Sequence, residues 1–561
     1  MSKLIINPIW LVFTLIVSLL TVIPFAKTGL PMEHDSLIQV QKNQQFAKAL
    51  SEGQFPVRLA PDFGYQSGYP IFDFMYPLPM YIGASLNYFG IGFADGVKIM
   101  IVTSMLLSSI GMYLLASKLW GPVGGFVSAT IYTLAPYHAV DLYVRGSTGE
   151  LMAMAIAPFI FYFMLRLLEG KRKKDWLICT FLISLLILSH NITALIFFPL
   201  IIITGVVYAF VHHDFKSLKP ITLSIIGGVL ITSYFWFPAL YDKQFVMADQ
   251  VFVESFNYAD HFVYPVQLFL YSPWGFGGSQ PGPIDGMSFK LEKQFLIIYT
   301  LAALAIFFLI FKKQKNAYLA AIFLVFGLLA GLLTLTISQP IWDKLPLIYL
   351  IQFPWRFLTL LIFCFGVIAG SIVSVIKQKD WQILTGMLIA FGILVSSINL
   401  FKPGPGEYQN DEMLLGKQFL ESTTTTKADE FRPKWAIVPK STPSENMVGV
   451  NSESGSVSNL EFRSNKVKFD LQNQEPTFVK VNKYYYPGWK VFVNGKEVQI
   501  DSPSSDGFIK LPVDIGPNVV ELEFTETFAR SASDYISLSF FVLSLFVVIV
   551  IRNNQWKRLM S

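Results

Sequence analysis

The chain has 561 residues, of which 53% are hydrophobic and only 14% are charged, against about a quarter charged in an average soluble domain. Runs of about twenty apolar residues recur along most of its length, so we predict a polytopic helical membrane protein. The formal net charge of +5 gives no argument for nucleic-acid binding. Both cysteines, Cys179 and Cys364, lie inside apolar runs, which argues against a disulfide framework or a thiolate metal cluster.

Taken in chain order, the apolar runs predict about twelve spans. The predicted spans are 8–26, 95–117, 121–136, 149–168, 176–190, 192–211, 220–241, 292–311, 317–337, 357–376, 382–400 and 534–551. The first run is expected to be a span rather than a cleaved signal peptide, because no A-x-A-like site follows it. The apolar segment 77–90 would rise only about 21 Å as a helix, short of a hydrocarbon core of about 30 Å. We predict an interfacial or re-entrant helix there.

Basic clusters orient these spans. The clusters lie at 171–174, 312–315, 377–379 and 552–558. With a cytoplasmic N-terminus and about twelve spans, all four fall on the cytoplasmic side, as the positive-inside rule requires. We therefore expect a multi-pass plasma-membrane protein with both termini in the cytoplasm. The extracytoplasmic side then receives the long segments 27–76, 242–291 and 401–532.

The polar segment 401–532 changes in character after about residue 434. Short alternating runs such as KVKFDLQ and WKVFVNGKEVQI are typical of strands. Asn494-Gly495 between VFV and KEV is a strong hairpin signal. We predict a linker and then an extracytoplasmic β-sandwich over about 434–526, inserted before the last span. The predicted domains are a transmembrane domain at 1–400, the linker and sandwich at 401–532, and the final span with a basic tail at 533–561.

Ionisable residues gather on the predicted outer side, at the ends of spans. They are Glu33, His34, Asp35, Asp62 and Asp73 in the first outer loop, Arg145 and Glu150 in YVRGSTGE, His190 in LSHNIT and Arg356 in QFPWR. Ionisable groups at membrane depth are costly and indicate function. Arginine forks suit phosphate oxygens, and a carboxylate near a bound phosphate suits a general base toward a hydroxyl. These residues predict transfer of a group from a lipid-borne phosphate to an acceptor outside the membrane.

Each of these residues also has a structural interpretation. The structural alternatives are an ion pair between Arg145 and Glu150, interfacial anchoring by Arg356, helix capping by His190 or Asp73, and solvation of Asp35. The sequence contains no phosphate-cradling glycine loop, no nucleophile elbow and no histidine spacing typical of zinc.

Several stretches match patterns of known membrane protein families. They are HDSLIQVQ at 34–41, GYPIFDFMYPLPMYIG at 68–83, YVRGSTGELMAMAIAP at 143–158, LSHNITALIF at 188–197, QFPWRFL at 352–358 and YYYPGWKVFVNGKEV at 484–498. They resemble the YfhO-like and pyruvoyl-tetrahydropterin-synthase-related bacterial membrane proteins. An acidic first outer loop, many spans and an outer β-domain resemble the GT-C superfamily of membrane glycosyltransferases. The name of the second family suggests pterin chemistry, which no motif here supports.

The resemblance to GT-C enzymes implies a glycosyltransferase that uses a polyprenyl-phosphate-linked sugar donor. The acceptor would be an extracytoplasmic glycan, teichoic acid or protein, and we expect a single inverting displacement. The resemblance implies that Asp35 is the catalytic base and that Arg145, Arg356 and His190 bind the donor phosphate. Glu150 would orient Arg145. The supporting residues would be Glu33, His34, Asp62 and Asp73. We predict no cofactor and assign no metal ligands. Some GT-C members hold a divalent cation with paired carboxylates, and the sequence leaves such a cation open without supporting it, because it has no clear DxD pair.

Two other classes stay open. A transporter or flippase of lipid-linked saccharides would also need outer charges and many spans, but it is expected to show broken helices at mid-membrane and half-to-half symmetry. A non-catalytic surface-polysaccharide assembly protein would need the β-domain but no converging ionisable groups. The sugar, the acceptor and the oligomeric state do not follow from the sequence.

Overall fold

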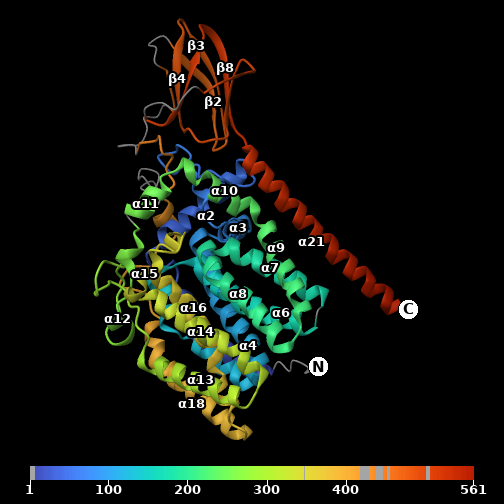
Figure 1. Ribbon diagram of the computed structural model, residues 1–561. Helices are drawn as coiled ribbons and strands as arrows, with labels where there is room; N and C mark the ends of the chain where they lie inside the picture. Colours follow the sequence, from blue (N-terminus) through green and yellow to red (C-terminus); the bar gives the residue numbers. More distant parts are fainter. Residues whose placement is uncertain are drawn as a thin grey trace.

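The chain folds into a bundle of long apolar helices with a β-domain at one end (Figure 1). The computed structural model describes residues 7–170, 172–254, 256–346, 348–416, 429–437, 447–450, 455–500 and 506–560. The longer helices are α1 (Pro8–Val22), α2 (Ser36–Ser51), α4 (Phe93–Thr133), α6 (Thr148–Gly170), α7 (Lys173–Ser189), α8 (Asn191–His212), α9 (Leu218–Ile231), α13 (Lys293–Phe311), α14 (Lys315–Thr334), α16 (Phe357–Ala369), α18 (Lys379–Ser397) and α21 (Phe528–Met560). The shorter helices are α3 (Leu78–Tyr88), α5 (Pro136–Val140), α10 (Ser233–Tyr241), α11 (Ala248–Glu254), α12 (Pro265–Phe269), α15 (Gln339–Trp342), α17 (Ser371–Ser374) and α19 (Asp411–Leu415).

Nine helices in the described part of the chain are long and apolar enough to cross a membrane. The count is ten when Phe215–Ile231 and Ser233–Phe245, which meet at 65°, are taken as one bent span. The sequence predicted about twelve. The remaining difference lies at α7, which has 17 residues, and at α4, whose 41 residues were predicted as two spans.

α4 reverses direction at Gly121, between Phe93 and Thr133. Gly121 has φ 79° and is followed by Pro122. A Cβ added to Gly125 would lie 2.8 Å from the carbonyl oxygen of Tyr113, whereas residues twelve apart in one straight helix are about 18 Å apart. The two arms therefore pack against each other as a hairpin, which agrees with the two predicted runs.

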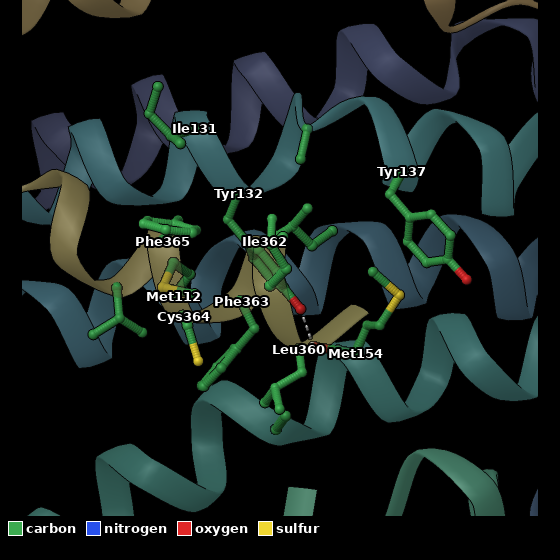
Figure 2. Packing of buried hydrophobic residues seen from close by; sticks show 14 of the residues in the cluster. Met112, Ile131, Tyr132, Tyr137, Met154, Leu360, Ile362, Phe363, Cys364 and Phe365 are labelled. Atoms are coloured by element: carbon green, nitrogen blue, oxygen red, sulfur yellow. Dashed lines mark hydrogen bonds between the residues drawn. The ribbon is translucent and has the colours of Figure 1, made fainter. Parts of the chain in front are cut away.

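α16 is the centre of the bundle. All of its residues from Phe357 to Ala369 are buried, and a helix that is apolar all round belongs in a core. Figure 2 shows Phe363 and Cys364 of this helix beside Tyr132, whose hydroxyl donates to the carbonyl oxygen of Met154 at 2.9 Å. This packing fixes the N-terminal end of α16, which begins directly after Arg356.

The predicted first outer loop, 27–76, contains the helix α2, which the sequence interpretation missed. Its sequence SLIQVQKNQQFAKALS is rich in Gln, Lys and Ala, which are good helix formers, but polar residues interrupt its apolar pattern. α3 is a helix of 11 residues and does not belong to the nine, which confirms the prediction of a short helix there.

The β-domain consists of two sheets that enclose a common core. One sheet has the order β1-β4-β7 and the other β2-β3-β8-β5-β6. The strands are β1 (Val448–Val450), β2 (Ser456–Phe462), β3 (Lys466–Asn473), β4 (Thr477–Tyr484), β5 (Trp489–Val493), β6 (Lys496–Val498), β7 (Phe508–Val513) and β8 (Gly516–Phe524). Asn494 and Gly495 both have positive φ and join β5 to β6, where Val493 pairs with Lys496, so the hairpin prediction is confirmed. The TTTT run at 423–426 lies outside the described residues.

Buried charges join the β-domain, the last helix and the first outer loop. Arg530 of α21 is fully buried and forms ion pairs with Asp73 at 3.1 Å and Asp242 at 2.8 Å. Its Nη1 donates to the carbonyl oxygen of Pro487 in the β-domain at 2.8 Å. Tyr486 donates its hydroxyl to Asp73 at 2.9 Å. These contacts fix the β-domain over the end of the bundle.

Candidate active site

A cavity of about 1450 Å³ lies at the end of the bundle that carries the β-domain. Five of the residues that the sequence singled out line this one cavity: His34, Asp35, Arg145, His190 and Arg356. They come from segments far apart in the chain, so their meeting is a result of the tertiary fold.

Helix N-termini converge on this cavity. Asp35, His190 and Arg356 are the N-cap residues of α2, α8 and α16. Ser147, which directly precedes α6, lines the cavity as well. Helix N-termini carry partial positive charge and unpaired amide groups, so this arrangement favours an anion in the cavity.

Arg145 lies between two carboxylates. Its Nη1 donates to Asp141 at 2.5 Å, to Glu150 at 2.6 Å and to the hydroxyl of Tyr137 at 3.1 Å. The guanidinium also lies over the ring of Trp355, 4.7 Å from its centroid. The ion pair with Glu150 that the sequence suggested is present, and it holds one end of a guanidinium that lines the cavity.

Glu150 is itself held from the central helix. Its Oε1 accepts hydrogen bonds from Thr359 at 2.5 Å and from Tyr137 at 3.0 Å. Glu150 does not line the cavity, so it acts on the site through Arg145. Asp141, four residues before Arg145, is the second anchor and was missed by the sequence interpretation. A helical spacing of i and i+4 was the signal that could have found it.

Arg356 has no such anchor. Its Nη1 donates to the backbone oxygen of Ile351 at 2.8 Å and to the side chain of Gln352 at 2.7 Å. Its Nε is buried without a hydrogen-bond partner, and no carboxylate lies within ion-pair distance among the described residues. A cation at the positive N-terminal end of α16 is electrostatically unfavourable unless an anion is bound there.

His190 caps α8 and also lines the cavity. Its Nδ1 accepts from the backbone N–H of Thr193 at 3.1 Å, so in the neutral imidazole the proton is on Nε2. The ring packs on Tyr76, with centroids 4.9 Å apart. The capping interpretation is therefore correct, and it leaves Nε2–H as a donor for a bound group.

Asp35 lies beside Arg145. Its backbone N–H donates to the carbonyl oxygen of Arg145 at 2.9 Å, and the N–H of His34 donates to that of Val144 at 3.0 Å. The carboxylate is half-buried and makes no hydrogen bond or ion pair within the described chain. His34 faces another neighbour, because its Nε2 donates to the carbonyl oxygen of Phe276 at 2.9 Å.

Three predicted supporting residues do not reach the cavity. Glu33 is buried against Ser36, and burial raises the pKa of its carboxyl to about 8. Asp62 forms an ion pair with Lys48 at 2.6 Å. Asp73 belongs to the buried charge cluster of Arg530 and does not cap α3, whose N-cap residue is Pro77.

One side of the cavity is apolar and reaches the surface of the bundle. Leu195 of α8 and Leu240 of α10 line it and are 48% and 58% exposed. Val229, Trp236 and Phe198 continue this wall. An apolar wall beside converging cationic groups fits an amphiphile whose anionic head enters the cavity.

The described residues contain no group of three or more His, Cys, Asp or Glu side chains that could hold a metal ion.

A family model described as "6-pyruvoyl-tetrahydropterin synthase related domain; membrane protein" matches residues 72–403. The chain belongs to this family. The chain is 20% identical over 337 residues to an uncharacterized protein of Lactococcus lactis subsp. cremoris (strain MG1363). The match covers 58% of the chain and 53% of the relative, so the chain spans about half of the relative's length.

The family member is also similar to solved structures of three membrane proteins. Arabinofuranosyltransferase AftD from Mycobacteria matches with a TM-score of 0.47 and 13% identity, over 70% of this chain and 26% of that chain. The Archaeoglobus fulgidus oligosaccharyltransferase matches with a TM-score of 0.45 and 12% identity, over 71% of this chain and 54% of that one. ArnT from Cupriavidus metallidurans, solved with undecaprenyl phosphate, matches with a TM-score of 0.41 and 15% identity, over 68% of this chain and 63% of that one.

Proposed function

We propose that the protein is a membrane glycosyltransferase that moves a sugar from a polyprenyl-phosphate-sugar donor to a hydroxyl of an acceptor outside the cytoplasm. The observation that carries this proposal is the content of one cavity. It holds Asp35, a carboxylate that has no side-chain partner among the described residues, together with Arg145 and Arg356, and the N-termini of α2 and α16 meet there. It also has an apolar wall open to the bundle surface.

The donor phosphate would bind where the cationic groups converge. Within the described chain, the buried Nε of Arg356 has no hydrogen-bond partner, and the Nε2–H of His190 is left to donate to a bound group. Within the described chain, Asp141 and Glu150 both accept hydrogen bonds from Nη1 of Arg145, and neither engages its other nitrogens. The polyprenyl chain would lie along Leu195, Leu240 and their apolar neighbours.

The chemical step would be a single inverting displacement. The acceptor O–H gives its proton to the Asp35 carboxylate while its oxygen attacks the anomeric carbon. The bond between that carbon and the phosphate oxygen breaks, and polyprenyl phosphate leaves with the electron pair. Charge builds on the phosphate oxygens as the bond breaks, so preorganised donors such as Arg145 and Arg356 lower the barrier.

The orientation in the membrane is part of the proposal. The basic residues at 172–174, 312–315 and 377–379 lie at helix ends opposite to those that border the cavity. α21 also ends away from the β-domain (Figure 1). The positive-inside rule then places both termini in the cytoplasm and the cavity outside.

The test is sugar transfer by the Asp35→Asn variant. Labelled sugar on a synthetic short-chain polyprenyl phosphate is supplied to the full chain in detergent with a crude envelope acceptor fraction, and release of polyprenyl phosphate is measured. We expect a loss of about 10²-fold or more in rate with donor affinity retained, because asparagine cannot accept the proton.

The matched control is Asp62→Asn, on the same outer segment but paired with Lys48 outside the cavity. It should transfer nearly as well as wild type. If wild type binds the donor and moves it across vesicles without releasing polyprenyl phosphate, the protein is a transporter. If Asp35→Asn transfers normally, the assignment of the base is wrong.

A further inference from the structure

The β-domain supplies part of the cavity wall. Tyr484 of β4 lines the cavity together with Gly64 and Tyr65 of the first outer segment. The N–H of Tyr484 donates to the carbonyl oxygen of Ser67 at 2.8 Å. A Cβ at Gly64 would lie 2.8 Å from the Tyr484 ring, and Gly64 has φ 67°. This close approach makes the β-domain a fixed wall of the site.

α2 runs from the cavity to the β-domain. At its start, Asp35 bonds the backbone of Arg145. Just past its end, the carboxylate of Glu52 accepts a hydrogen bond from the N–H of Ser464 in the β-domain at 2.7 Å. Asp35 and Lys42 both line the cavity, and residues seven apart share one helix face, about 10.5 Å apart along the axis.

Lys42 is an unusual residue for this position. Its side chain is 4% exposed, and in the described part of the chain no carboxylate lies within ion-pair distance of it. Burial lowers the pKa of its ammonium to about 8, although Asp35 and Glu430 act in the opposite direction. A buried ammonium without a close partner is costly, so the fold keeps this cation for a reason other than stability.

Lys243 shows the contrast. It lines the same cavity, but its Nζ forms an ion pair with Asp249 at 2.6 Å and donates to the hydroxyl of Tyr349 at 3.3 Å. The positive charge of Lys243 is therefore balanced by a carboxylate of the protein itself. Lys42 is therefore the cavity lysine whose charge is available to a ligand.

An in-line displacement places the attacking hydroxyl opposite the leaving phosphate. If the phosphate lies at Arg145 and Arg356, the acceptor extends past Asp35 along α2 toward the β-domain. Lys42 is the next ionisable residue on that face. The distance between Asp35 and Lys42 corresponds to one or two sugar units, because a sugar ring is roughly 5 Å long and α2 rises about 1.5 Å per residue.

We propose that Lys42 is a specificity-determining residue that binds an anionic group, phosphate or carboxylate, on a saccharide acceptor held between α2 and the β-domain. This inference rests on the proposed glycosyltransferase function. It assigns Lys42 to the acceptor side of the cavity, apart from the donor phosphate at Arg145 and Arg356.

The experiment measures acceptor-side binding with the donor end occupied. The full chain in detergent is saturated with short-chain polyprenyl phosphate and titrated calorimetrically with methyl glucoside, methyl glucoside 6-phosphate and methyl glucuronide. Wild type should bind both anionic probes about tenfold more tightly than the neutral one, the size expected of one charge-assisted contact. If only one anionic probe binds more tightly than the neutral probe, the anionic group of the acceptor is a phosphate or a carboxylate accordingly.

Lys42→Met should remove this preference, Lys42→Arg should keep it, and Lys243→Met is the matched control that should also keep it. Lys42→Met should be at least as stable as wild type, since it removes a buried charge. Lys42→Gln repeats the test with a polar neutral side chain. Each variant is also titrated with polyprenyl phosphate itself.

The outcomes separate the two proposals. No binding of polyprenyl phosphate by wild type contradicts the proposed function. Normal binding of polyprenyl phosphate, with no preference for the anionic probes in wild type, overturns the role of Lys42. The role of Lys42 is also overturned if the Lys42→Met variant keeps the preference for the anionic probes. It is overturned as well if Lys42→Met weakens the binding of all three probes equally, because Lys42 would then act as a counter-charge for Asp35.

Discussion

The backbone N–H of Asp35 donates to the carbonyl oxygen of Arg145 across 2.9 Å. This bond joins the first outer segment to the bend between α5 and α6, and it places a free carboxylate beside an anchored guanidinium. The two side chains serve different purposes in the proposed reaction, the first as base and the second as phosphate ligand.

Arg145→Lys should impair transfer nearly as much as Arg145→Ala. Asp141 and Glu150 both contact Nη1, so a single lysine ammonium would be drawn to these carboxylates and lost to the phosphate. A point charge also lacks the planar fork. The measurement is donor kcat/KM for each variant, and a lysine variant that keeps most of the turnover would contradict this argument.

Arg356→Met should weaken binding of polyprenyl phosphate by about tenfold or more without lowering the apparent melting temperature. The wild-type guanidinium has an unpartnered Nε at the positive end of α16, so its removal relieves an unfavourable charge. The comparison variant is Arg166→Met, near the end of α6 that lies away from the cavity. Arg166 is paired with Asp175 at 3.1 Å, and its loss should lower stability and leave phosphate binding unchanged.

Arg530→Met should destabilise the protein by about 3–5 kcal/mol, because it removes the ion-pair partner of the buried Asp242 and leaves the buried Asp73 with the more distant Arg58, 3.4 Å away. Limited proteolysis should cut between the β-domain and α21 more readily than in wild type. Asp73→Asn should act in the same way, and activity per folded molecule should change much less than in Asp35→Asn. A stable but inactive Asp73→Asn variant would instead make Asp73 the base.

Glu33→Gln should remove a pH dependence of stability. Burial raises the pKa of Glu33 from 4.5 to about 8, so the folded protein keeps a proton that the unfolded chain releases. Stability from this group is fully present below about pH 4.5 and is lost as the pH rises to about 8. Each pKa unit corresponds to about 1.4 kcal/mol, so the effect reaches a few kcal/mol.

The measurement is the apparent melting temperature of wild type and Glu33→Gln from pH 5 to about pH 9. The two proteins should agree at the acidic end, and the variant should melt higher at the alkaline end. Parallel curves would show that Glu33 is ionised in the folded state.

The sequence by itself determined the elements and the participants. Long apolar runs require helices in a bilayer, because every backbone polar group must be satisfied within its own segment. Alternating short runs and Asn494-Gly495 required a hairpin-built β-domain, since only certain residues adopt left-handed turns. The choice of Asp35, Arg145, His190 and Arg356 also came from the sequence, because charge at a span end is costly enough to be informative.

Only the tertiary structure decided how these residues meet. Whether a carboxylate forms an ion pair depends on partners distant in the chain. Asp73 therefore pairs with Arg530, whereas Asp35 lines the cavity. Asp141 and Lys42 carry no signal of their own in the sequence. Asp141 gains its role from the π-helical bend that carries Arg145. The role proposed for Lys42 depends on the packing of α2, which buries this lysine at the cavity without an ion-pair partner in the described chain.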